Sequence, residues 1–475
     1  MRVLAALCVV ALDAARGAPD AAQVARVQQQ IADTRREILE LYGADLDGLS
    51  EGVVFPGGPQ GRQQLVERFL RAFALGDSFV IAVGGMSDVA GHGNYFEEAY
   101  PNVCGDALRP VFEAAGVRFQ VRNMAMGGVP SFPNSVCMAD NFGGDADVVV
   151  WDFRMVERDV HKGELFIRQA LLMPRAPFVM YKRYQSYLRK DLKYAWEPAG
   201  LHVVDEMAAY NKLKKRSPAL QNDRFCAKDP CPCPGQVRWH AGFKLQRFRG
   251  PRRGHHMALA YLDLFADAVA TYGALLADGG APGPDDARWT IRRRPTLPEP
   301  FSKPLQAAFG STAYRCAMTW QPRVGRGLLD LVDPQLGING WELRHPSERT
   351  KKVTEQGQGQ CINQIGACHY RDEKRSLVGN AKSHWVFFNV PGVRDGGSIA
   401  FCGDFASRKF QDYALIVVNQ EEVMGELEPW LESKTLGVAS ACFSTSHNVV
   451  EGDNVVGFRV VSGDLSLALT HLVWT

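Results

Sequence analysis

The sequence predicts an α/β domain built on a parallel sheet, followed by an all-β sandwich or jelly-roll domain. Apolar runs of strand length alternate with helical stretches up to about residue 277, prolines then crowd the stretch 278–307, and short strands separated by Gly, Asp and Asn follow. A chain of 475 residues is also too long for one ordinary core, so two globular domains are expected.

Four apolar runs have the length expected of strands buried on both faces of a parallel sheet. They are Phe79–Val83, Val117–Val121, Val148–Trp151 and Phe178–Tyr181. Helices are expected between them at Gln63–Phe73, Ala107–Ala115 and Leu165–Leu172, and the long apolar helix Met257–Leu276 closes the domain. This pattern predicts a layered α/β domain over residues 61–277.

The N-terminal segment 18–60 is expected to be helical. Apolar residues recur with helical period between Ala22 and Tyr42, which predicts a surface helix packed on the α/β domain. Before it, the apolar run Val3–Leu12 and the small residues that follow resemble a signal peptide covering residues 1–17, with a short buried helix as the alternative. The protein is therefore expected to be secreted or to stand at the cell surface.

Residues 278–307 are expected to be a linker, because prolines at this density cannot continue a helix or a central strand. The segment 308–475 then predicts a β-sandwich. Its expected strands are Trp385–Val390, Ser398–Cys402, Tyr413–Val418, Val455–Val461 and Leu465–Leu469. Four tryptophans there could stack on sugar rings, with core packing as the alternative for each: Trp341, Trp385, Trp430 and Trp474.

The cysteines favour disulfides. Eleven are present, and removal of a signal peptide with Cys8 would leave an even number, as in secreted disulfide-bonded proteins. Cys361 with Cys368 and Cys402 with Cys442 are the expected local pairs. The cluster at 226–233 lacks a fourth ligand at zinc-finger spacing, so no metal is expected.

Charge and hydropathy exclude several classes of partner. The 54 basic and 52 acidic residues give a net charge of +2, which supplies no field to attract nucleic acid. No membrane span and no cofactor are expected in the mature chain.

The most informative motif follows the first predicted strand. The run Phe79–Val83 leads into GGMSDVAGHGN at 84–94, which places Ser87 after paired glycines. α/β folds bind ligands beyond the carboxyl ends of their parallel strands, and glycine tolerates the sharp turn needed there. Ser87 is therefore a candidate nucleophile.

The blocks at 85–91 (GMSDVAG), 121–128 (VRNMAMGG) and 239–242 (WHAG) resemble, in their order, those of the SGNH (GDSL-type) hydrolase superfamily. The resemblance implies a three-layer flavodoxin-like domain. It also implies that Ser87 attacks an ester carbonyl, that His240 accepts its proton, and that the N–H groups of Ser87 and Gly128 hold the oxyanion. His255 and His256 are rival bases, but their position at a helix start favours capping or surface roles.

The chain departs from the family pattern at three positions. The family keeps asparagine where this chain has Val156, an aspartate where it has Val237, and an aspartate where it has Met86. Loss of one oxyanion donor typically costs about 10²–10³ in rate, and loss of the orienting acid about 10⁴. Replacements could come from Asn94 or His92 as oxyanion donors and from Asp152 or Glu157 as the orienting acid.

Two hypotheses from different classes remain. The first is a secreted esterase or acyltransferase that acts on O-acyl esters of a carbohydrate through Ser87 and His240. The alternative is a catalytically inactive glycan- or surface-binding protein on the same scaffold. A lipase of the same superfamily would require a wide apolar cleft.

Overall fold

The computed structural model describes most of both predicted domains. The described residues are 18–40, 58–87, 89–90, 99–153, 156–157, 160–182, 196, 199–204, 251–280, 296–300, 312–344, 374–405, 410–435, 438–462 and 465–475.

The α/β domain is organised around a five-stranded sheet in which every neighbouring pair of strands is parallel. Its strands are β1 (Ser78–Gly85), β2 (Arg118–Asn123), β3 (Val148–Asp152), β4 (Phe178–Lys182) and β5 (Leu201–Val204). The order β2-β1-β3-β4-β5 is that of flavodoxin-like folds. The prediction of a parallel α/β domain is confirmed.

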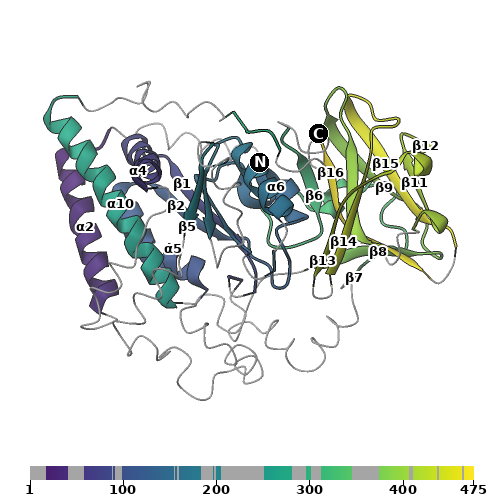
Figure 1. The fold of residues 1–475 in the computed structure, drawn as a ribbon, viewed down its shortest axis with the longest axis horizontal. Helices are drawn as coiled ribbons and strands as arrows, with labels where there is room; N and C mark the ends of the chain where they lie inside the picture. Colours follow the sequence, from purple (N-terminus) through teal and green to yellow (C-terminus); the bar gives the residue numbers. More distant parts are fainter. Residues whose placement is uncertain are drawn as a thin grey trace, which may run out of the picture.

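Helices cover both faces of this sheet (Figure 1). One face packs against α2 (Ala21–Glu40), α4 (Gly58–Leu75), α5 (Tyr100–Ala115) and α10 (Pro251–Ala277). The other face packs against α6 (Val160–Leu171), which lies between the sheet and the β domain. The alternation of side chains along each strand divides the core in two, so β1 gives Ile81 to one layer and Val80 to the other.

Two local predictions are corrected. β2 is an edge strand whose side chains alternate between exposed and half-buried, so it is not buried on both faces. Arg118 and Gln120 interrupt the apolar residues of this strand, as suits a position with one neighbour. α10 begins at Pro251, so His255 and His256 lie inside the helix and are half-buried, not capping or surface residues.

α10 belongs to the core of the α/β domain. Its stretch Arg253–Ala277 is long and apolar enough to cross a membrane. In the 18-residue segment of that stretch that meets this test, however, 50% is buried inside the protein. Leu262, Phe265 and Val269 are fully buried beside α2, α4 and α5. Packing against three amphipathic helices explains why this helix is apolar on most of its circumference.

The β domain is a sandwich of two antiparallel sheets, as predicted. One sheet runs β13-β14-β10-β16-β8-β7 with β6 paired to β16, and the other runs β12-β11-β15-β9. The bounds are β6 (Arg315–Met318), β7 (Glu342–Arg344), β8 (Ser376–Asn380), β9 (Val386–Val393), β10 (Ile399–Phe405), β11 (Ala414–Val418), β12 (Glu421–Glu422), β13 (Glu428–Thr435), β14 (Val438–Thr445), β15 (Gly452–Val460) and β16 (Ser466–Trp474). Apolar side chains from both sheets fill the space between them.

The two domains share a buried junction. A disulfide joins Cys137 to Cys316, across a separation of 179 residues. Around it, Phe132 and Leu165 of the first domain form one apolar cluster with Trp320 and other residues of the second. A covalent bond and a common core hold the domains in a fixed relation.

The other cysteines meet the predictions in part. Cys402 and Cys442 form the expected disulfide between β10 and β14. Cys104 is buried in α5 as a thiol. The predicted pair Cys361–Cys368 lies outside the described residues.

Candidate functional site

Ser87 lies two residues beyond the carboxyl end of β1 and is half-exposed. The carbonyl of Met86 accepts hydrogen bonds from the amides of Val89 and Ala90, at 3.0 and 2.9 Å, which forms a tight turn around the serine. Gly85 is required at the strand end, because a Cβ there would lie 2.5 Å from Val89 Cγ2. The backbone therefore presents the Ser87 side chain at the edge of the sheet where α/β enzymes bind ligands.

The loop after β2 runs beside the Ser87 turn. The Met126 amide donates to the Gly85 carbonyl at 3.0 Å, and Asn123 Nδ2 donates to the Val89 carbonyl at 2.8 Å. These bonds hold the segment 123–128 against the loop that carries Ser87. The family resemblance had marked Asn123 only as a sequence signature, and its structural role is to tie the two loops together.

Gly128, the predicted oxyanion donor, lies in the left-handed region of backbone space. Its φ is +72°, a conformation that glycine adopts without strain, and no heavy atom lies within 4 Å of where a Cβ would be. Within the described part of the chain, no acceptor is hydrogen-bonded to its amide. Gly128 as a residue is half-exposed, on the loop that runs beside the Ser87 turn.

Glu157 anchors that same loop from the segment after β3. One of its carboxylate oxygens accepts hydrogen bonds from the Ser131 amide at 3.2 Å and from Ser131 Oγ at 2.9 Å. The glutamate is buried, so these charge-assisted bonds compensate for its desolvation. Beside it, Val156 packs against the apolar core in the position where the family keeps an asparagine.

Asp152 ends β3 directly opposite Gly85 and is fully buried. It forms an ion pair with Arg253 of α10 and accepts a hydrogen bond from the Tyr100 hydroxyl at 2.9 Å. The Arg253 guanidinium also lies over the Tyr100 ring, 3.8 Å from its centre. Asp152 therefore fixes the starts of α5 and α10 beneath the candidate site, a function that the sequence did not reveal.

Several predicted site residues lie outside the described residues: His240, Asn94, His92 and Val237. Whether His240 meets Ser87, and whether Asp152 or Glu157 orients it, stays a prediction. Of the rival bases, His255 is half-buried in α10, and burial lowers its pKa to about 4. A histidine with this pKa is neutral at pH 7 but a weak proton acceptor.

No group of three or more metal-ligating side chains is found among the described residues. The cluster Cys226, Cys231 and Cys233 lies outside them.

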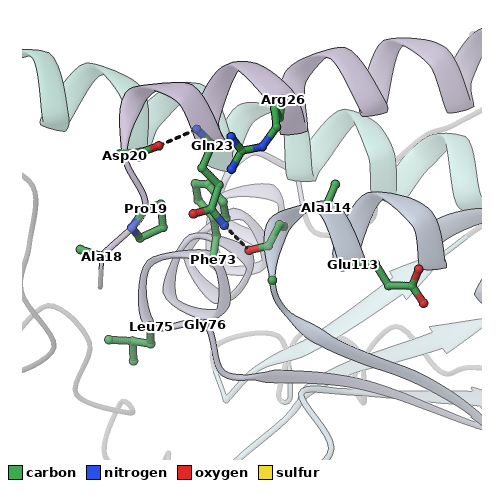
Figure 2. A pocket seen from close by; sticks show the side chains of 12 residues that line it. Ala18, Pro19, Asp20, Gln23, Arg26, Phe73, Leu75, Gly76, Glu113 and Ala114 are labelled. Atoms are coloured by element: carbon green, nitrogen blue, oxygen red, sulfur yellow. Dashed lines mark hydrogen bonds between the residues drawn. The ribbon is translucent and has the colours of Figure 1, made fainter. Parts of the chain in front are cut away.

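A cavity of about 530 Å³ lies at the opposite edge of the sheet, beneath the start of α2 (Figure 2). Gly76 and Gly116, which precede β1 and β2, line it together with Asp20, Gln23 and Arg26. Gln23 donates to the Ala115 carbonyl at 2.9 Å, which ties α2 to the end of α5. This cavity shares no residue with the Ser87 and Gly128 loops.

The structure separates the four tryptophans of the β domain. Trp341 and Trp474 are buried in the core, and Trp430 packs on Tyr314 at the domain junction with ring centres 5.3 Å apart. Trp385 is half-exposed and stacks on Phe387, with ring centres 5.6 Å apart. Of the four, Trp385 and Trp430 are half-exposed, and Trp430 packs at the domain junction.

Comparison with known proteins gives a distant structural likeness. No protein-family model and no curated protein matches the chain. A solved two-domain esterase (CEX) active on acetylated mannans is similar at 13% identity and a TM-score of 0.42, covering 89% of this chain and 97% of that one. The same esterase co-crystallised with mannopentaose is similar at 12% and 0.40, covering 87% and 94%. Neither likeness identifies the reaction or the substrate of this chain.

Proposed function

We propose that this protein is a secreted SGNH-type serine esterase or acyltransferase that acts on O-acyl esters of a carbohydrate. The observation that carries the proposal is the pairing of two loops at the carboxyl edge of the parallel sheet. One presents a half-exposed Ser87, and the other holds a half-exposed Gly128 whose amide has no hydrogen-bond acceptor among the described residues. A nucleophile next to a preorganised N–H donor is the arrangement that acyl transfer requires.

In the proposed reaction, Ser87 Oγ attacks the ester carbonyl carbon while His240 takes the hydroxyl proton. The Ser87 and Gly128 amides donate to the developing oxyanion. Collapse of the tetrahedral intermediate breaks the bond to the sugar oxygen, which receives the proton from His240. Water, or a second sugar hydroxyl in an acyltransferase, then attacks the acyl-serine and releases the enzyme.

The proposed oxyanion site has few hydrogen-bond donors. Val156 supplies no side-chain donor, so the two backbone amides are the primary oxyanion donors, with Asn94 as a candidate third. Because Asp152 and Glu157 are already engaged by Arg253 and Ser131, a proposed orienting role would be additional to these contacts.

Secretion and the carbohydrate substrate rest on the second domain and its disulfides. Disulfides such as Cys137–Cys316 and Cys402–Cys442 are stable in oxidising compartments, which agrees with export. The rings of Trp385 and Phe387 stack on each other at the start of β9, an edge strand of the four-stranded sheet. Gly457 of the neighbouring strand β15 leaves room for the Phe387 ring. Exposed, rigid aromatic faces of this kind suit the apolar face of a sugar ring.

The central test is hydrolysis of a chromogenic acetyl ester by the full-length chain. Ser87→Ala should lower kcat by about 10⁴ or more, with His240→Ala close behind, because the residual rate depends on the oxyanion site and binding alone. Ser446→Ala, an exposed serine of the β domain, is the matched control and should leave the rate unchanged. Equal rates in wild type and Ser87→Ala would refute the esterase.

The carbohydrate assignment has a separate test. Trp385→Ala should reduce retention by acetylated polysaccharides in affinity electrophoresis about tenfold, because stacking contributes about 1–2 kcal/mol, while kcat on the soluble ester stays at the wild-type value. Retention equal to wild type would remove this surface from the proposal.

The catalytically inactive binding protein is the second candidate function, and Val156 favours it. Polysaccharide binding that depends on Trp385, together with no Ser87-dependent hydrolysis, would support that reading.

A further inference from the structure

One contact crosses from the β domain into the candidate site. Lys374, which precedes β8, donates a hydrogen bond from Nζ to the carbonyl oxygen of Gly127. Gly127 belongs to the loop after β2, 247 residues away in the sequence. The β domain thus touches the loop that runs beside Ser87.

A contact at the Gly127 carbonyl also affects the Gly128 N–H, because both belong to one peptide group. The Gly127 carbonyl and the Gly128 N–H belong to the same planar unit, and in a trans peptide they point in opposite directions. A lysine ammonium on the carbonyl therefore turns the N–H away from the β domain. It also draws electron density toward the oxygen, which makes the N–H a stronger donor.

The surroundings fix both partners of the contact. On the lysine side, Thr319 Oγ1 donates to the Arg375 carbonyl at 2.5 Å, and Ser376 is fully buried in β8. On the loop side, the Met126 amide is bound to Gly85 and Ser131 is bound to Glu157. The loop is thus tied to the α/β domain on both sides of the Gly127–Gly128 peptide, and the β domain contacts that peptide at the Gly127 carbonyl.

The domain junction makes the arrangement rigid. The Cys137–Cys316 disulfide and the buried cluster around Trp320 lie on the same side of the α/β domain as this loop. The imidazole of His471 adds a contact across the junction, with Nε2 3.3 Å from Asn134 Oδ1. These contacts hold the β domain, from which Lys374 extends, beside the loop that contains Gly127.

We infer that Lys374 is a positioning residue that aims and polarises the Gly127–Gly128 peptide as an oxyanion donor, so that the β domain completes the site of the α/β domain. This inference rests on the proposed esterase function. It assigns the second domain a part in the chemical step, in addition to substrate binding.

The test uses the full chain and the soluble ester 4-nitrophenyl acetate. Lys374→Met keeps most of the side-chain volume and removes the charge. It should lower kcat about tenfold with KM unchanged, since the lost effect acts on the transition state. Lys374→Arg, which can still donate to the carbonyl, should recover most of that loss. Lys382→Met, an exposed lysine of the same domain, is the matched control and should behave as wild type.

A second measurement separates positioning from folding. The rate of inactivation by a fluorophosphonate, which forms a tetrahedral adduct on Ser87, should fall in Lys374→Met by about the same factor as kcat, at an unchanged Tm. Wild-type kcat in Lys374→Met, or a loss that follows Tm and is not restored by arginine, would overturn the inference. If Ser87→Ala hydrolyses the ester as fast as wild type, the proposed function itself fails. A silent Lys374→Met with an inactive Ser87→Ala refutes the inference alone.

Discussion

The two edges of the parallel sheet are built from similar groups and differ in what they leave accessible. Each edge buries an aspartate beside β3 and pairs it with an arginine, Asp147 with Arg175 before the strand and Asp152 with Arg253 at its end. At the amino edge the Val80 amide also donates to Asp147 at 2.9 Å. At the carboxyl edge Ser87 and Gly128 remain half-exposed above the ion pair.

This difference indicates that a buried ion pair does not by itself mark a functional site. Burial raises the pKa of Asp147 above its ordinary value, although the Arg175 guanidinium opposes the shift. A perturbed pKa at the amino edge therefore reflects structure. The cavity beneath the start of α2 lies at that edge as well, away from Ser87.

The largest effect on kcat that distinguishes the two edges is expected at Gly128. Gly128→Ala adds a methyl group where φ is +72° and should displace the donor, lowering kcat by up to about 10². Gly279→Ala is the matched control, because Gly279 has φ +71° and equally open space at the end of α10. Ester hydrolysis and Tm are measured for both. If Gly128→Ala and Gly279→Ala lost the same Tm and had the same kcat, Gly128 would matter only for folding.

At the amino edge, Asp147→Asn should act on stability alone. Removing one partner of this buried pair leaves Arg175 with Asp77 as its remaining carboxylate and should cost about 3 kcal/mol of unfolding free energy. Asp145→Asn, which removes an exposed pair with Arg122, should cost less than about 1 kcal/mol. Denaturant unfolding gives both values. A fall in kcat per folded molecule in Asp147→Asn would mean that the two edges are not independent.

The smallest expected effect is a pH dependence of the unfolding free energy that arises from His202. This residue lies near the start of β5, also toward the amino edge of the sheet. Its ring stacks on Phe178 at 4.0 Å, shares a 3.1 Å hydrogen bond with Gln64, and has its pKa lowered to about 4 by burial and then by Arg68. Because the folded pKa lies below the unfolded value of 6.5, the stability contributed by neutral His202 is complete above pH 6.5 and is lost as the pH falls toward 4.

The loss should reach at most about 3 kcal/mol for this residue. His202→Phe keeps the stacking but cannot be protonated, so its unfolding free energy should change less between pH 7 and pH 4.5. Denaturant unfolding at the two values measures the difference. The same change in both proteins would exclude His202 as the cause.

Much of the fold could be predicted from the sequence. Continuous apolar runs such as Val148–Trp151 predicted strands buried on both faces, and β3 is buried along its whole length. The helical period near Val24, Val27 and Ile31 predicted α2 and the face it buries. β5 was missed, because a strand of four residues gives no period to detect.

Less of the site could be predicted. The strand-to-glycine pattern located Ser87, and the family resemblance located Gly128. The partners of Asp152 and Glu157 could not be predicted, because Arg253 and Ser131 become neighbours only when separate elements pack. The predicted roles of His240 and Asn94 rest on the sequence alone.

The sequence by itself predicted the first four strands of the parallel sheet with the helices between them, an α/β domain followed by a β domain, and the serine that follows β1. These properties depend on local spacing and on the burial of apolar faces. Only the tertiary structure decided which of the four tryptophans are buried and that Lys374 reaches Gly127. Both depend on which surfaces meet when the domains pack, and a linear sequence carries no signal for a contact between residues 247 positions apart.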